Sequence, residues 1–420
     1  MYKKIINILN TTTVRQSFIT VVSTFLAAGL GAVFYLALAR VMGPREYGIF
    51  SLILTLITLS VTVAELGMSQ GIIKFAAKSL GGDKHLPYLK LALLTKIGVG
   101  IILGLVLWLF PKIIAVSLLH QPDVAPLLPL AGLSILGVLL FGYSISVFQG
   151  LQKFLLWGLF QTGANLIRLI FMGLSALFVR INSFWGLVLF ASAPITGFFS
   201  SWFFLPRRTL QVSVSSNHIK QFWDFSKWTA AFTITSSIAA RLDMFLTARF
   251  LDLSQTGIYA LAAIMASFLP QLSSAIGAVT ATKFASFSDH SHSQKYLRKA
   301  LLFSVGVSLT VALTLIPTAL VVIRFTGKDF SVSFAPFIIL LLSLAIFTSL
   351  NPIRDSILYF YHRPQFFFWT GLAQALILII AGGLLIPAFG IMGTAVSVLI
   401  SHIFMALACI WQYQQLSKKA

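Results

Sequence analysis

Apolar residues fall into long continuous runs along the chain, each bounded by charged residues, Pro or Gly. The runs are about 20 residues long, which is what a helix needs to cross the ~30 Å hydrocarbon core of a bilayer. They do not alternate between apolar and polar residues as the strands of a membrane barrel do. The pattern predicts twelve transmembrane helices, at 17–39, 48–69, 89–110, 127–149, 155–178, 184–205, 228–250, 257–279, 300–323, 336–352, 366–388 and 391–413.

The composition excludes a soluble protein. Apolar residues make up 58% of the chain and charged residues only 10%, whereas about a quarter of the residues in a soluble domain are charged. Phe alone occurs 38 times, more often than a water-facing surface of this size tolerates. We therefore expect an all-α membrane protein that crosses the bilayer many times.

Positive charge is distributed unevenly between the connections. Of the 30 Lys and Arg residues, 20 lie at the termini or in the connections that follow even-numbered spans, 7 in the opposite connections and 3 inside spans. Because cytoplasmic loops carry the excess of Lys and Arg, we expect a multi-pass protein of the cytoplasmic membrane with both termini in the cytoplasm. The net charge of +20 is spread over many connections, which argues against nucleic-acid binding.

The two halves of the chain match each other in a constant register. Short motifs recur at an offset of 209 residues, and of 210 after a one-residue gap. The matching pairs include Ala39-Arg40 with Ala248-Arg249, Gly48-Ile49-Phe50 with Gly257-Ile258-Tyr259, Lys74-Phe75-Ala76 with Lys283-Phe284-Ala285, and Lys153 with Arg363. Six spans return the chain to the side where it began, so the repeats are parallel. Transporters with such repeats carry the substrate path between their halves.

The duplication predicts two six-helix lobes around a central cavity. The N-terminal lobe would comprise residues 1–208 and the C-terminal lobe residues 228–420, joined by the polar cytoplasmic linker 209–227. Aromatic and basic residues gather where the linker meets the seventh span, and we expect them to anchor the chain in the membrane interface. These residues are Lys220, Phe222, Trp223 and Trp228.

Several motifs resemble the Wzx-type oligosaccharide flippases, which form the polysaccharide-transporter branch of the multidrug/oligosaccharidyl-lipid/polysaccharide (MOP) exporter superfamily. They are FYLALARVMGPREYGIF at 34–50, AELGM at 64–68, RLD at 241–243, TGIYALA at 256–262 and PAFGIMGTA at 387–395. The resemblance implies a cationic cavity that moves glycans linked to undecaprenyl diphosphate from the inner to the outer leaflet. We expect the lipid-linked glycan and membrane lipid as ligands, polymerases or glycosyltransferases as protein partners, and no cofactor or metal.

An ionised side chain inside a bilayer costs several kcal/mol, so each one is a candidate for function. In the fifth predicted span, Gln161, Asn165 and Arg168 are spaced i, i+4, i+7 and share one helix face. Arg168 lies about 14 residues, or roughly 21 Å, from the cytoplasmic end. We expect these residues to bind the substrate, with Arg168 on the diphosphate. The alternative is an arginine that packs between helices or extends its stem toward the headgroups.

The seventh predicted span carries Thr233, Ser237 and Arg241 at four-residue intervals, with Asp243 two residues further on. Two residues apart on a helix, Arg241 and Asp243 point to different sides and are not expected to pair. The Arg241 guanidinium could hold diphosphate oxygens bidentately. Asp243 is assigned to gating or ion coupling. The alternative is that both residues form static ion pairs between helices.

Four further charged residues are candidates near the ends of spans. Glu65, at the cytoplasmic end of the second span, and Arg40 and Arg249, at the outer ends of equivalent spans, are expected to act in gating. Lys96 lies about two turns into the third span. It is assigned to substrate binding, with the alternative that its stem reaches the interface.

Two features near the C-terminus are interpreted as structural. Arg354 and Asp355 follow Asn351-Pro352, where the tenth span is expected to break, and we expect them to form an ion pair at the cytoplasmic face. His402 is a lone histidine in the last span and is expected to be hydrogen-bonded within the core.

Other functions have less support. The chain has no GxxxxGK[ST] phosphate loop and no HExxH, CxxC or GxSxG in a suitable setting, so we do not expect an ATPase or another enzyme. Within the spans the cations Lys96, Arg168 and Arg241 outnumber the acids, which favours an anionic substrate. The alternatives are a cation-coupled multidrug exporter and a flippase for cell-wall lipid precursors in the same superfamily. A membrane glycosyltransferase or polymerase is disfavoured because the outer loops are short.

Overall fold

The computed structural model describes residues 12–78, 82–287 and 289–419, and these residues form helices and turns without a strand. Nine helical segments in this part of the chain are long and apolar enough to cross a membrane. Two of them hold two spans each, because α2 (Thr12–Glu65) is interrupted at Gly43 and α15 (Pro364–Lys419) at Gly390. The seventh predicted span is shared between α9 (Ser216–Ala239) and α10 (Leu242–Phe250). Each of the twelve predicted spans thus coincides with helix, while Lys3 and Lys4 lie outside the described residues.

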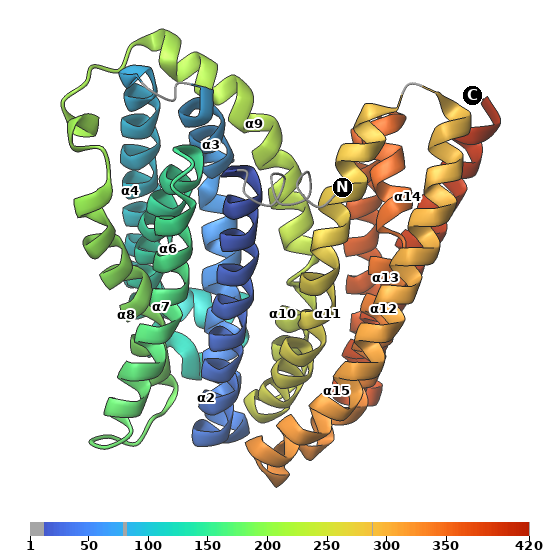
Figure 1. Ribbon diagram of the computed structural model, residues 1–420. Helices are drawn as coiled ribbons and strands as arrows, with labels where there is room; N and C mark the ends of the chain where they lie inside the picture. The colour runs from blue at the N-terminus through green and yellow to red at the C-terminus, as the bar shows by residue number, and fades with distance from the viewer. Residues whose placement is uncertain (1–11, 79–81, 288, 420) are drawn as a thin grey trace, which may run out of the picture. The chain divides into compact units, whose positions relative to one another are not determined.

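The described residues up to Met42 and Ile53–Ile234 form one compact unit, unit 1. Besides most of α2 and the first part of α9, its longer helices are α3 (Met68–Lys78), α4 (Leu86–Leu109), α6 (Leu128–Gly150), α7 (Phe154–Ser175) and α8 (Ser183–Ser201). Short helical turns connect them: η1 (Asp83–His85), α5 (Pro111–Ile113), η2 (Ile114–Leu118), η3 (Pro122–Leu127), η4 (Trp202–Phe204) and η5 (Arg207–Leu210). Helix α6 is central, since it packs against α3, α4, α7 and α8 (Figure 1).

Gly43–Leu52 and Thr235–Ala420 form the second compact unit, unit 2. It contains α10, α15, α11 (Leu253–Ser286), α12 (His290–Thr326), α13 (Phe334–Ser349) and α14 (Asn351–Asp355), with the turns η6 (Lys328–Ser333) and η7 (Ser356–Phe360). Helix α13 is central here, because it packs against α11, α12 and α15. The chain passes from unit 1 to unit 2 within α9, and the lobe boundary at 209–227 stays a prediction from the sequence.

Residues 43–52 come from the first half of the sequence but pack within unit 2. A Cβ atom added to Gly48 would lie 1.8 Å from the carbonyl oxygen of Leu253, and one added to Gly257 would lie 2.0 Å from that of Pro44. The two backbones are therefore in direct contact, and only glycine fits at either position. Gly257 follows Gly48 by 209 residues and Leu253 follows Pro44 by the same number, so one contact is made twice in the register of the duplication.

A second pair of equivalent positions has the same backbone conformation. Gln152, between α6 and α7, has φ 57°, and His362, 210 residues later, has φ 53°. These left-handed conformations are uncommon outside glycine. The N–H of the following residue, Lys153 or Arg363, donates to a carbonyl of the preceding helix over 2.8 and 3.1 Å respectively. The repeat seen in the sequence is therefore also a repeat of local structure.

The first part of α9 packs back onto unit 1. Phe222 is only 4% exposed, and its ring lies 5.8 Å from that of Phe75 and 6.3 Å from that of Tyr88. The prediction that Phe222 anchors the chain in the interface is wrong, because an anchor would be exposed to lipid headgroups. Trp223 is exposed, as an anchor requires, and the side chain of Trp228 lies outside the described residues.

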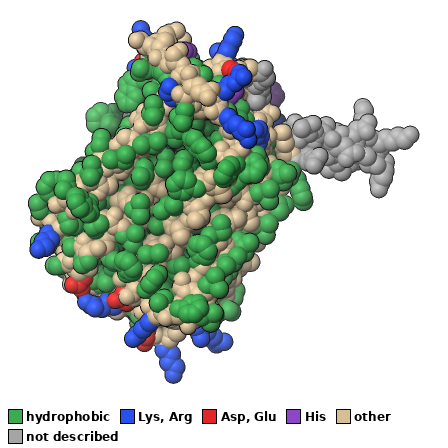
Figure 2. Space-filling model, turned by 90° about the vertical axis from the view of Figure 1, so that its left-hand side faces the viewer, with side chains coloured by type: hydrophobic (Ala, Val, Ile, Leu, Met, Phe, Trp, Pro, Cys, Tyr) green, Lys and Arg blue, Asp and Glu red, His purple; other side chains and the backbone are tan. Residues whose placement is uncertain are grey.

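Apolar side chains cover the middle of the face shown in Figure 2, and Lys and Arg gather toward its two ends. Large exposed hydrophobic residues line the long helices, among them Phe18, Trp108 and Leu155 at 68%, 63% and 58% exposure. Apolar side chains on this scale are stable only against hydrocarbon. The prediction of an all-α membrane protein is confirmed.

Candidate functional site

Arg168 lies in the middle of α7, surrounded by side chains of unit 1. Its Cζ is 4.6 Å from the ring centroid of Phe190 in α8 and 5.8 Å from that of Phe34 in α2, within the range of a cation–π interaction. One guanidinium nitrogen donates to Oδ1 of Asn165 over 3.2 Å. Asn165 in turn donates to the backbone carbonyl of Gln161 over 3.1 Å. Asn165 and Arg168 of the predicted polar face are therefore joined by their side chains, and Gln161 takes part through its backbone carbonyl.

The charge of Arg168 is not neutralised within the described residues. None of the ion pairs found there includes Arg168, and its Nε is buried without a hydrogen-bond partner. A buried polar atom of this kind needs an explanation, because leaving it unpaired costs about 1–3 kcal/mol. An arginine with one face on aromatic rings and donors to spare can bind an anion bidentately.

Lys96 is paired with Glu65. Nζ of Lys96, whose side chain is fully buried, lies 2.6 Å from Oε1 of Glu65, whose side chain is 21% exposed. Ser69 completes the cluster, since its hydroxyl donates to Oε2 of Glu65 over 2.7 Å and accepts from Lys96 over 3.1 Å. The alternative that Lys96 extends to the interface is wrong, because its side chain is fully buried and its Nζ is held by Glu65 and Ser69.

The Lys96–Glu65 pair sits at a break in the chain. Helix α2 ends at Glu65, and Leu66 and Gly67 follow with φ 45° and 71° before α3 begins. A Cβ on Gly67 would lie 2.5 Å from the carbonyl oxygen of Ser226 in α9, so glycine is required by both φ and space. Because its charge is already balanced, Lys96 is a weaker candidate than Arg168 for holding an anion. Its role in substrate binding and that of Glu65 in gating stay predictions.

Arg241 and Asp243 lie at the break between α9 and α10. Arg241 is exposed and has the non-helical position before α10. Despite their four-residue spacing, Thr233, Ser237 and Arg241 therefore do not lie on one continuous helix. Asp243 forms no ion pair within the described residues. Its Oδ2 accepts a 2.6 Å hydrogen bond from the hydroxyl of Tyr259, a fully buried residue of α11. The expectation that Arg241 and Asp243 do not pair is confirmed.

Arg40 and Arg249 occupy equivalent ends of helices, as their register predicts. Arg40 precedes the break in α2 at Gly43, and Arg249 lies in the last turn of α10. Both side chains are exposed. Their assignment to gating stays a prediction.

The structure places Arg354 in the core of unit 2 instead of an interface pair with Asp355. The tenth span breaks at Leu350, between α13 and α14, next to the expected position. The chain then continues through η7 to Phe360, and this extension places Arg354 inside the lobe. Its guanidinium donates to Asn351 and lies 4.0 Å from the ring of Phe347, while Asp355 accepts from Thr280. The predicted Arg354–Asp355 pair is wrong.

His402 packs beside the same phenylalanine. Its ring centroid is 4.6 Å from that of Phe347, and its Nδ1 is 2.6 Å from the Ser343 hydroxyl. The expectation of a hydrogen-bonded core histidine is confirmed. Sequence reasoning missed Tyr259 as the partner of Asp243 and Phe347 as that of Arg354, and no local spacing could have revealed the first. The second follows a seven-residue helical spacing that was available in the sequence.

Comparisons with known proteins place the chain in a family. Residues 13–282 match the family described as polysaccharide biosynthesis protein. The lipopolysaccharide biosynthesis protein WzxC of Escherichia coli (strain K12) is 25% identical over 300 residues, which are 68% of this chain and 57% of that protein. The chain thus aligns with little more than half the length of this relative.

Solved structures share the fold. A lipid II flippase MurJ in an inward closed conformation superposes with a TM-score of 0.78 at 18% identity, covering 94% of this chain and 87% of MurJ. An inward-facing multidrug resistance MATE family transporter of the MOP superfamily superposes with a TM-score of 0.71 at 11% identity, covering 94% of both chains. The chain therefore shares the fold of these transporters, and it belongs to the polysaccharide biosynthesis protein family.

Proposed function

We propose that this protein is a flippase that moves an oligosaccharide linked to undecaprenyl diphosphate from the inner to the outer leaflet of the cytoplasmic membrane. The observation that carries the proposal is the uncompensated guanidinium of Arg168 in the middle of a membrane span. The family and the relative WzxC agree with a role in glycan biosynthesis. The distribution of Lys and Arg supports cytoplasmic termini.

A charge inside the bilayer is retained only where it has a partner or a task. Lys96 has its partner in Glu65. Among the described residues, Arg168 donates to an amide and lies against two aromatic rings, and these contacts orient the guanidinium without forming an ion pair with it. A diphosphate supplies the oxygens and the negative charge that this group lacks.

Transport requires that binding be nearly equal in the states open to either leaflet. A diphosphate held far more tightly in one state would trap the carrier there, because a ligand shifts an equilibrium by its differential affinity. One uncompensated arginine, Arg168, is a modest charge for this purpose, and Arg241 stays a second candidate for the diphosphate. The prenyl chain remains in lipid while the headgroup and sugar cross by alternating access. No bond of the substrate is made or broken, so the protein is not an enzyme in this proposal.

Substitution of Arg168 tests the proposal. In cells whose own flippase is deleted, Arg168→Ala should reduce surface glycan at least tenfold while the protein level in the membrane stays normal. Arg168→Lys should retain partial export, because it keeps the charge and loses the planar fork. Arg180→Ala, at an exposed arginine outside the spans, is the matched control and should export normally. Full export by Arg168→Ala at an equal protein level would refute the proposal.

A second candidate function is a cation-coupled multidrug exporter of the same superfamily. The observation that favours it is Asp243, an acid inside a span that is hydrogen-bonded to Tyr259 and has no cationic partner among the described residues. Drug efflux that is abolished by Asp243→Asn and unaffected by Arg168→Ala would establish this function instead. A flippase for cell-wall lipid precursors would depend on Arg168 in the same way, and it is distinguished by its substrate.

A further inference from the structure

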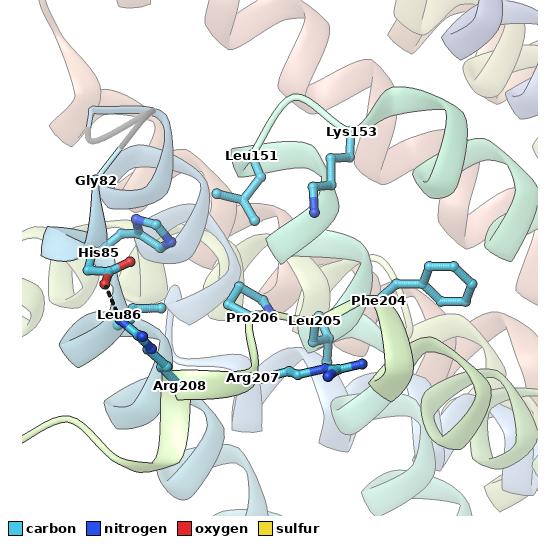
Figure 3. A pocket seen from close by; sticks show the side chains of 11 residues that line it. Gly82, His85, Leu86, Leu151, Lys153, Phe204, Leu205, Pro206, Arg207 and Arg208 are labelled. Carbon is cyan, nitrogen blue, oxygen red and sulfur yellow. Dashed lines mark ion pairs between the residues drawn. The ribbon is translucent and has the colours of Figure 1, made fainter.

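An open cavity of about 560 Å³ lies at one end of unit 1 (Figure 3). Neither Arg168 nor Lys96 is among the residues that line it. Three pieces of chain form its walls: η1 with the start of α4, the turn between α6 and α7, and the segment from η4 to η5 that follows α8. The residues that matter for its chemistry are Asp83, His85, Lys153, Phe204, Arg207 and Arg208. The Lys and Arg distribution predicts that this end of unit 1 faces the cytoplasm.

The charge of the cavity is positive and only partly balanced. Arg208 lies 3.7 Å from Asp83, and both side chains are more than two-thirds exposed, so this pair is weak. Lys153 and Arg207 form no ion pair or side-chain hydrogen bond within the described residues. Three cations against one acid leave the cavity with two positive charges for a ligand.

His85 adds a polar group that lacks a partner. Its side chain lines the cavity yet is only 7% exposed, and its Nδ1 is buried without a hydrogen bond. Such groups are rare in folded proteins, since most buried polar atoms find a partner. A ligand oxygen in the cavity would accept from Lys153 and Arg207, the two cations without an ion pair among the described residues. The donors therefore match a phosphate group.

The rim of the cavity indicates where the phosphate comes from. Phe204, which lines the cavity, is 50% exposed, and its neighbours Phe203 and Trp202 are 77% and 40% exposed. Exposed aromatic residues at the end of a span mark the level of the lipid headgroups. Leu151 and Leu205 add apolar surface to the cavity wall. A lipid can place its phosphate on the cations and its acyl chains along these rings, whereas a soluble phosphate gains nothing from them.

We propose that this cavity binds the phosphate headgroup of an anionic phospholipid. The lipid joins η1, the α6–α7 turn and η5, which are far apart in the sequence, and so couples this end of unit 1 to the composition of the leaflet. Basic pockets between the cytoplasmic ends of membrane helices bind anionic lipids by the same chemistry. The proposal does not depend on which substrate the protein transports.

Lipid binding by the purified full-length protein tests the proposal. The protein in detergent would be titrated with phosphatidylglycerol and, separately, with phosphatidylcholine. Native mass spectrometry would give the apparent Kd of the most tightly bound molecule of each lipid. Each interfacial cation strengthens lipid binding about fivefold, so Lys153→Gln with Arg207→Gln should weaken phosphatidylglycerol binding about 25-fold. Phosphatidylcholine binding should not change. Lys153→Arg should keep the wild-type affinity, which separates loss of charge from loss of fold.

Two comparisons complete the test. The control variant, Arg363→Gln with Lys295→Gln, removes the same charge from exposed positions of unit 2. Arg363 is the counterpart of Lys153 in the second repeat. This variant should bind phosphatidylglycerol with the wild-type affinity. Equal phosphatidylglycerol affinity in the wild type and the Lys153/Arg207 double variant would overturn the proposal. Glycerol 1-phosphate tests the source of the phosphate: binding as tight as that of the lipid would also overturn it, because the aromatic rim would then contribute nothing.

Discussion

Replacing Gly48 by Ala should destabilise unit 2, because Gly48 brings two helix backbones into contact. The new Cβ would lie 1.8 Å from the Leu253 carbonyl oxygen and 2.9 Å from the Gly257 nitrogen. Both are backbone atoms, so no side chain can rotate away. Real Cβ contacts are essentially never shorter than 3.0 Å, and the start of the second span must therefore move from α11 by about 1.2 Å or more.

The cost of this movement can be estimated. Overpacking in a tight interior costs about 1–3 kcal/mol, while Ala for Gly within a helix returns about 0.5–1 kcal/mol. The net loss is then about 0.5–2 kcal/mol, which for a unit of this size lowers the unfolding temperature by roughly 1–8 °C. Because the contact is made twice, Gly257→Ala should have a similar effect. The double variant should lose less than the sum, since the first substitution already separates the helices.

Intrinsic fluorescence during heating of the detergent-purified protein measures these effects. Gly98→Ala is the matched control, since Gly98 also lies inside a helix, α4, and a Cβ there would have no neighbour within 4 Å. It should leave the unfolding temperature unchanged or raise it. If Gly48→Ala unfolds at or above the temperature of Gly98→Ala, the backbone contact does not stabilise the fold.

Two further predictions concern stability. Lys96→Met should lower the free energy of unfolding by about 3 kcal/mol, because it leaves Glu65 without its cation. Adding Glu65→Leu should restore most of the loss. If the double variant is as unstable as Lys96→Met, the loss of the ion pair is not the cause of the destabilisation. Asp289 caps the N-terminus of α12, where its carboxylate accepts a 3.1 Å hydrogen bond from the His292 backbone N–H. Hydrogen bonds from the His292 side chain and backbone hold the pKa of the Asp289 carboxyl below its usual value. This stabilisation is present above the usual carboxyl pKa and is lost as the pH falls through the lowered pKa. In a plot of unfolding temperature against pH, Asp289→Ala should therefore reduce the slope on the acid side. An unchanged slope would refute this prediction.

The positions of the spans were predictable because the bilayer imposes their length. Helices α4 and α6, at Leu86–Leu109 and Leu128–Gly150, lie within a few residues of the predicted 89–110 and 127–149. A continuous apolar run does not reveal a break inside it, however. The interruption at Arg241 was therefore missed, and with it the loss of a single polar face through Thr233 and Ser237.

Which side an apolar residue faces was not predictable, because lipid and the protein interior are equally apolar. Phe222 was expected at the interface, and its burial depends on Phe75 and Tyr88, more than 130 residues earlier in the sequence. Contacts between residues on the same helix were easier to predict, because the hydrogen bond between Asn165 and Arg168 follows directly from helical spacing. Lys96 and Glu65 are 31 residues apart in the sequence and lie on different helices, so only the fold brings them together.

The doubled glycine contact also records how such a chain could arise. Position 44 of one repeat touches the glycine of the other repeat, and the position equivalent to 44 touches Gly48 in return. A contact in which each partner uses the same surface is the isologous interface of a two-fold homodimer. A six-helix ancestor that paired with a second copy of itself would have had this contact before the two genes were fused. Gly48 and Gly257 are then the two equivalent positions of that one interface, each held against the backbone of the other repeat.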